Sequence, residues 1–209
     1  MNTRLKFFIT LITTIGLASC ASYKAQYRST EKNWQAATLP NKPLAHQVYL
    51  IGDAGGGDEN HPRNTLQLLG KQLEKADENS SIIFLGDNIY PNGLPKKGHP
   101  DRVTAEQNLT TQLDIVKDFA GNIFFIPGNH DWESEDGVKG VRRQEQFVQK
   151  YLKRGNIFLP NNGCSGPAVK ELADNTVLIA IDSKWYLENW DALPILKQEL
   201  YAYQPQKHP

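Results

Sequence analysis

Three short motifs that combine glycine with oxygen-bearing side chains each follow an apolar run of the sequence. They are Gly-Asp-Ala-Gly at 52–55, Gly-Asp-Asn-Ile-Tyr at 86–90 and Gly-Asn-His-Asp at 128–131. Such apolar runs are typical of buried strands in a parallel sheet, and ligands bind beyond the carboxyl ends of these strands. The side chains expected to converge at one sheet edge are those of Asp53, Asp87, Tyr90, Asn129 and His130. Their oxygens and one imidazole form a donor set suited to metal ions.

The positions of these residues suit a pair of metal ions and the chemistry of a phosphate group. Neighbouring strands would let Asp53 bind one metal terminally while Asp87 bridges two. Asn129 offers a neutral carbonyl oxygen, and a phenolate at Tyr90 is a good ligand for ferric iron. The imidazole of His130, followed by a carboxylate at position 131, suits acid–base chemistry. Two metals about 3.5–4 Å apart activate water and hold a phosphate for in-line attack.

Each motif taken alone also has a purely structural interpretation. A Gly-Asp pair after a strand often forms only a turn, with the Asp capping the next helix. Gly-Asn-His-Asp is equally compatible with structure and with function. The occurrence of all three in this order, each at the end of a predicted strand, favours a functional site.

Length and charge set loose bounds on the class of protein. A chain of 209 residues is long enough for one α/β domain with a sizeable core. Its 23 basic and 23 acidic residues balance. Charge therefore gives no argument for a nucleic-acid partner, and we expect no binding to nucleic acid.

The first twenty residues resemble a bacterial lipoprotein signal. A basic start with Arg4 and Lys6 precedes a mostly apolar stretch at 7–17, which is too short to span a bilayer comfortably. The stretch closes in Leu-Ala-Ser-Cys, ending at Cys20. In signals of this kind the Cys becomes the new N-terminus and carries lipid. An ordinary secretory signal and a short buried helix are the alternatives.

The lipoprotein interpretation divides the chain into three parts. These are a signal peptide at 1–19, a polar tether at 20–45 that begins at the lipidated Cys20, and a domain at 46–209. The domain is then expected on the exported side of the bacterial cell envelope, anchored to a membrane through the lipid. Cys164 would be left without a cysteine partner, in a turn-rich stretch where a structural role is favoured over that of a nucleophile.

Strands and helices alternate after the tether, as is typical of a layered α/β fold with a largely parallel sheet. The expected strands lie near 47–52, 81–86, 122–127, 156–159, 168–173 and 176–182. The expected helices lie near 63–77, 102–120, 140–154 and 194–203. Gly121 and Gly155 are placed to end the second and third of these helices.

The three motifs resemble those of the calcineurin-like metallophosphoesterase superfamily. The Asp-Asn-Ile-Tyr sequence at 87–90 resembles the form found in its purple acid phosphatase branch, and the resemblance covers about residues 46–200. It implies a layered α/β fold, a β-sandwich of two mixed sheets flanked by helices. It also implies metal-dependent hydrolysis of a phosphoester substrate.

The resemblance implies a role for each motif residue by position. Asp53 resembles the terminal ligand of the first metal, Asp87 the bridging carboxylate, and Tyr90 the tyrosinate that makes the ferric form purple. Asn129 resembles a ligand of the second metal, close to the phosphate. His130, oriented by Asp131, resembles the residue that stabilises the transition state or protonates the leaving group. The implied cofactors are iron at the Tyr90 site and zinc, manganese or iron at the second.

The chain departs from the family pattern after the third motif. The family places a His at the end of a further strand and a later Gly-His-x-His sequence, and neither is found here. After His130 the next histidine is His208, which does not follow a predicted strand. His61 and His99 fall in loops at the motif edge, where solvated positions are favoured over substrate contacts. We therefore expect a domain incomplete at its C-terminus, either as a gene fragment or as a true short product, with weak metal binding and little turnover.

Two other functions remain open from the sequence. One is a lipid-anchored, non-catalytic binding module that retains the phosphoesterase fold. The other, weaker one is a metal-independent α/β hydrolase that uses Asp182 or Cys164. The sequence contains no Gly-x-Ser-x-Gly nucleophile motif to support the latter.

Overall fold

The structure is a computed structural model that describes residues 44–56, 64–173 and 175–202. All of these belong to the compact unit formed by Leu44–Pro209. The predicted signal peptide, the tether up to residue 43 with Cys20, and the loop residue His61 lie outside the described residues. Within the described stretches, no helix has both the length and the apolar character needed to cross a membrane.

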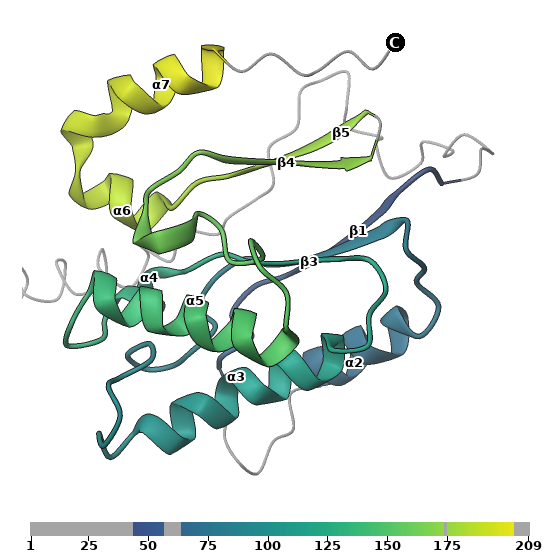
Figure 1. Cartoon of the computed structure of the whole chain (residues 1–209), viewed down its shortest axis with the longest axis horizontal. Helices are drawn as coiled ribbons and strands as arrows, with labels where there is room; N and C mark the ends of the chain where they lie inside the picture. The colour runs from purple at the N-terminus through teal and green to yellow at the C-terminus, as the bar shows by residue number, and fades with distance from the viewer. Residues whose placement is uncertain (1–43, 57–63, 174, 203–209) are drawn as a thin grey trace, which may run out of the picture. The chain divides into compact units, whose positions relative to one another are not determined.

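A three-stranded parallel sheet forms the centre of the described unit (Figure 1). Its strands, in spatial order, are β1 (Gln47–Ile51), β2 (Ser80–Phe84) and β3 (Asn122–Phe125). Ile51 pairs with Phe84, and Phe84 pairs with Phe125, so all three strands end at the same level. The three motifs therefore leave one edge of the sheet together, as the sequence predicted.

Three helices cover one face of this sheet (Figure 1). They are α2 (Asn64–Leu73), α3 (Arg102–Val116) and α5 (Val138–Leu152). The largest cluster of buried apolar side chains lies between them and the strands. Within it the rings of Phe84 and Phe125 stack, with centroids 4.2 Å apart. The helical spacing of apolar residues in the sequence, such as Leu66, Leu69 and Leu73 on α2, accounts for this buried layer.

A β-hairpin lies against the other face of the sheet (Figure 1). It consists of β4 (Ala168–Ala173) and β5 (Thr176–Ala180), which pair antiparallel. Among the described residues, a small buried cluster joins the hairpin to the sheet, and it consists of Ile83, Phe124, Leu159 and Ala180. The layered α/β architecture with a parallel sheet is confirmed, and the two faces of that sheet are covered to very different extents.

The remaining described elements are short helices. They are α4 (Asn129–Trp132), α6 (Ser183–Glu188), α7 (Leu193–Ala202) and two 3₁₀ turns, η3 (Asn161–Gly163) and η4 (Trp190–Ala192). The sequence predicted α7 but neither α4 nor α6, because one or two helical turns carry too few residues to show a periodic pattern. Both of these unpredicted helices border the candidate site.

Several predicted boundaries and one predicted strand are wrong. The segment 156–159 forms no strand, and Phe158 makes only an isolated parallel bridge with Phe125. The helix α3 ends at Val116 and not near Gly121. After it, the amide of Phe119 donates to the carbonyl of Val116 in a turn, and the ring of Phe119 is buried in the core. The α5 helix ends at Leu152, where Lys153 adopts the left-handed conformation that was expected of a glycine.

Candidate metal centre

The three motif loops touch one another directly through their backbones. The amide of Asp53 donates to the carbonyl of Gly86 at 3.2 Å, and that of Gly55 donates to the carbonyl of Asp87 at 2.9 Å. A Cβ atom on Gly128 would lie 2.2 Å from Oδ1 of Asp87, and one on Gly86 would lie 2.7 Å from the Cα of Gly128. Packing of the loops therefore explains the glycine that opens the second and third motifs.

Asp53 and Asp87 adopt the same unusual backbone conformation. Their φ angles are 54° and 52°, in the left-handed region that residues other than glycine rarely occupy. This turns the chain sharply at the end of β1 and of β2. Strained backbone of this kind is concentrated at functional sites. Its occurrence in equivalent residues of two adjacent strands favours the functional interpretation of the Gly-Asp motifs over a simple turn.

The side chains of Asp53, Asp87 and Tyr90 converge. The hydroxyl oxygen of Tyr90 lies 2.8 Å from Oδ1 of Asp53 and 2.8 Å from Oδ2 of Asp87. The hydroxyl has one proton for two carboxylates. Partial burial, together with hydrogen bonds to Asp87 and Asp53, raises the pKa of Tyr90 far above its usual value. Two carboxylates gathered around one phenol oxygen form an arrangement that a cation stabilises.

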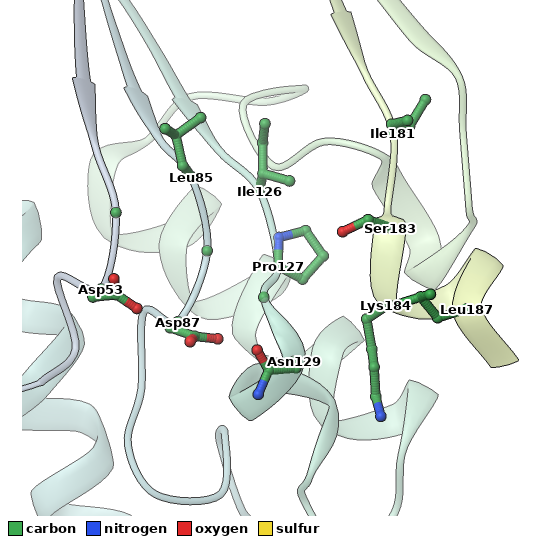
Figure 2. A pocket seen from close by; sticks show the side chains of 13 residues that line it. Asp53, Leu85, Asp87, Ile126, Pro127, Asn129, Ile181, Ser183, Lys184 and Leu187 are labelled. Carbon is green, nitrogen blue, oxygen red and sulfur yellow. The ribbon is translucent and has the colours of Figure 1, made fainter. Parts of the chain in front are cut away.

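Asn129 completes the group from the start of α4. Together with Asp53 and Asp87 it lines an open pocket of about 480 Å³. Figure 2 shows these three side chains arriving from the ends of β1, β2 and β3 at the same side of the pocket. The pocket is also lined by apolar side chains, which include Leu85, Ile126, Pro127, Ile181 and Leu187. The pocket therefore combines oxygen donors with a larger number of apolar side chains.

His130 is held so that one ring nitrogen is left for chemistry. Its Nδ1 lies 2.7 Å from the carbonyl oxygen of Pro91 and 3.3 Å from the carboxylate of Glu133. A carbonyl oxygen only accepts, so Nδ1 carries a proton and Nε2 is the nitrogen that exchanges one. The hydrogen bond to Pro91 raises the pKa of His130, and the charges of nearby carboxylates add to this effect. The ring also contacts that of Tyr90, with centroids 4.3 Å apart.

Asp131 joins the second motif to the third. Its fully buried carboxylate accepts hydrogen bonds from the amides of Gly128 at 2.8 Å and of Asn88 and Ile89 at 3.1 Å each. Burial raises the pKa of Asp131 to about 6, although these hydrogen bonds lower it. The hydrogen bond that orients the imidazole of His130 was expected from Asp131, and it is made by the carbonyl of Pro91. Asp131 instead fixes the loops that carry the candidate ligands.

Sequence reasoning missed two residues that support these loops. The fully buried side-chain amide of Asn88 donates to the carbonyl of Ile126 at 2.8 Å and to Asp131 at 3.2 Å. From α3, the amide of Gln112 donates to the carbonyl of Asn88 at 2.7 Å. The signal for Gln112 was a polar residue within the apolar stripe of its helix, and Asn88 stands inside the second motif itself.

Other sequence candidates lie elsewhere or have structural roles. His99 sits in a loop beside Glu135 and Asp101, at 3.6 Å and 3.8 Å. Cys164 is a free, exposed thiol. Asp182 is buried and caps α6. In the part of the chain that the structure describes, no cluster of three or more His, Cys, Asp or Glu side chains is arranged to hold a metal. The candidate donors are therefore two carboxylates, one phenol and one amide.

Oxygen donors beyond the ends of three consecutive parallel strands define an α/β protein with a site suited to hard metal ions. Residues 46–204 match the family model for calcineurin-like phosphoesterase, and the chain belongs to this family. Members of the family hydrolyse phosphoesters and typically bind two metal ions. No curated protein and no solved structure matches the chain significantly.

Proposed function

We propose that this protein hydrolyses phosphoesters at a dinuclear metal centre. The observation that carries the proposal is the convergence of Asp53 and Asp87 on the hydroxyl of Tyr90, each at 2.8 Å. A cation is the group that relieves the repulsion between two such carboxylates. Asp53 and Tyr90 would bind the first metal, Asp87 would lie between the two, and Asn129 would bind the second.

The residues around the centre would complete the reaction. When bound, the metals activate a water molecule and offset the charge of the phosphate. His130 is the group that donates a proton to the leaving oxygen through Nε2, since its Nδ1 is held by Pro91. Asp131 holds together the loops that carry Asp87 and Asn129 through its hydrogen bonds with the amides of Asn88 and Gly128.

We assign the site to the purple acid phosphatase type, with iron bound by Tyr90 and zinc, manganese or iron at the second position. The Tyr90 hydroxyl directs its one proton at the carboxylates of Asp53 and Asp87, so a highly charged ferric ion is better able to displace that proton than a divalent ion. The iron-loaded protein is expected to absorb visible light through its tyrosinate. Tyr90→Phe is expected to abolish that band.

The described donors are fewer than two metal ions normally take from a protein. We therefore expect the 209-residue chain to retain metals weakly and to turn over slowly. Metal content and phosphatase activity of the purified chain test this expectation. Two tightly held metals per chain together with robust turnover would contradict it.

Asp87→Asn is the sharpest test of the centre itself. It removes a carboxylate that would hold the metals, and we expect both metal uptake and residual activity to fall to background. Asp114→Asn is the matched control, because Asp114 is an exposed carboxylate on α3 that does not line the pocket. Equal metal uptake by wild type and Asp87→Asn would exclude the proposed centre.

The second candidate function is a lipid-anchored binding module that keeps the fold without catalysis. The observation in its favour is the lack of a cluster of three ligating side chains among the described residues. Asp53, Asp87 and Asn129 would then hold at most one ion. Asp87→Asn separates the two functions, because it would leave partner binding by a module intact.

Membrane attachment through Cys20 is a separate proposal, supported by the sequence of the first twenty residues. It places the domain on the exported side of the bacterial cell envelope. Cys20→Ala is expected to move the protein from the membrane fraction to the soluble fraction. Unchanged partitioning of this variant would contradict the lipid anchor.

A further inference from the structure

Lys184 brings a positive charge into the pocket of the candidate metal centre. Of the described residues that line the pocket, Lys184 is the one with a basic side chain, and Asp53 and Asp87 are the ones with acidic side chains. In Figure 2 it extends from α6 alongside Asn129, on the side away from the two carboxylates. The pocket thus has an acidic end, an amide in the middle and an ammonium group at the other end.

The start of α6 is fixed relative to the candidate ligands. Asp182, which is fully buried, caps α6 by accepting a hydrogen bond from the amide of Trp185 at 3.0 Å. The same carboxylate accepts a 2.6 Å hydrogen bond from Nε1 of Trp132. Trp132 belongs to α4, the helix that begins with Asn129. A continuous set of hydrogen bonds therefore sets the position of Lys184 against that of Asn129.

The ammonium group of Lys184 is available for exchange with a ligand. It pairs with Glu188 at 2.7 Å, one turn further along α6, and the two side chains are 28% and 58% exposed. Pairs of this kind on a helix surface contribute little to stability, so a more strongly charged anion readily replaces the carboxylate. The hydrogen bond with Glu188 raises the pKa of Lys184 and keeps it protonated.

We propose that Lys184 binds an oxygen of the substrate phosphate, on the Asn129 side of the pocket. This inference rests on the proposed function, because the metal-free pocket contains two carboxylates that repel an anion. Asp53, Asp87 and Asn129 would hold cations that offset part of the charge of a bound phosphate, and the remaining phosphate oxygens would still need a donor from the protein. Lysine is well suited to such an oxygen as a compact point charge with three donors.

The direct test measures the affinity of inorganic phosphate for the manganese-loaded 209-residue chain by isothermal titration calorimetry. Lys184→Gln is expected to weaken binding about tenfold, the typical effect of one lost charge-assisted contact. Lys184→Arg is expected to retain most of the affinity. The matched control is Lys117→Gln, since Lys117, directly after α3, also forms an ion pair with a nearby carboxylate, that of Asp114 at 3.3 Å, but does not line the pocket.

A second variant predicts a change of the opposite sign. Glu188→Gln removes the carboxylate that competes for Lys184 while leaving the lysine in place. Phosphate binding is therefore expected to become about two- to threefold tighter, in line with the modest strength of exposed ion pairs. A purely structural role for the Lys184–Glu188 pair predicts no tightening.

Metal content, measured on the same samples, distinguishes a failure of the proposed metal centre from a failure of the role proposed for Lys184. A wild-type chain that takes up no metal would overturn the proposed function and, with it, the role of Lys184. A metal-loaded Lys184→Gln protein that binds phosphate as tightly as wild type would overturn the role of Lys184 alone. Weaker binding by Lys184→Gln with unchanged metal content, and unchanged binding by Lys117→Gln, would support it.

Discussion

The two faces of the parallel sheet bury neighbouring residues of the same strand to very different extents. On β1, Ile51 faces the helices and is 6% exposed, whereas Leu50 faces the hairpin side and is 61% exposed. The helix face carries a large continuous core that includes the stacked Phe84 and Phe125. In the part of the chain that the structure describes, the buried cluster on the hairpin face consists of four residues.

The helix face therefore stabilises the fold, and the hairpin face leaves the pocket accessible from outside. The helix face fixes the strands, and through them the loops of Asp53, Asp87 and Asn129. The hairpin face is open where those loops emerge, and the pocket lies along it (Figure 2). Exposed apolar side chains on this face and beside the pocket include Val48, Leu50, Leu85 and Ile181. Apolar surface gathered in this way marks a region suited to contact with another molecule or segment.

The strongest test of the comparison removes a ring from the helix face. Phe125 is fully buried and stacks on Phe84, so Phe125→Ala leaves a large cavity in the main core. We expect a loss of about 3–5 kcal/mol in the free energy of unfolding, measured by urea denaturation. A loss below about 1 kcal/mol would show that the helix face does not dominate stability.

A matched pair of substitutions on β1 sharpens the same contrast. Ile51→Ala is expected to lower the free energy of unfolding by about 2–4 kcal/mol, because it empties space in the core. Leu50→Ala, one residue earlier on the open face, is expected to change it by no more than about 0.5 kcal/mol. Equal losses for the two variants would mean that the open face is covered in solution.

A smaller loss of stability is expected from breaking the hydrogen bond that joins α4 to the start of α6. Trp132→Phe keeps most of the ring but removes the donor to the buried carboxylate of Asp182. Loss of this hydrogen bond is expected to cost about 1–3 kcal/mol. Because the bond positions α6, the variant is also expected to weaken phosphate binding. An unchanged urea midpoint would show that α4 does not secure α6.

The smallest expected effect is a change in the pH dependence of stability. Burial raises the pKa of Asp182 in the folded protein above the ordinary value of about 3.9, although its hydrogen bonds lower it. Between these two pKa values the folded state binds more protons than the unfolded state, so this contribution to stability is present in acid and is lost as pH rises. Asp182→Asn retains an acceptor but does not titrate. Urea midpoints from pH 4 to pH 7 should therefore fall more steeply for wild type than for Asp182→Asn, and parallel curves would contradict the shift.

Local patterns were sufficient for the strands of the parallel sheet, for the three helices that cover it and for the motif edge. Alternation of apolar runs with amphipathic segments predicted β1, β2, β3, α2, α3 and α5. The parallel arrangement of the strands then placed Asp53, Asp87 and Asn129 together, because parallel strands present the same ends at the same edge. Boundaries were less predictable, since the turn at Phe119 and the left-handed Lys153 depend on packing around the helix ends.

The sequence by itself determined which residues leave the sheet at the candidate site, because strand ends and glycine-rich turns are encoded by neighbouring residues. Only the tertiary structure decided what those residues touch. It placed the Tyr90 hydroxyl between two carboxylates, brought the imidazole of His130 into a hydrogen bond with the carbonyl of Pro91, and buried Asp131 against the loops. It also paired β5 with β4 and brought Lys184 into the pocket. These contacts join residues far apart in the chain, and side-chain spacing within a segment carries no information about which distant segment will pack against it.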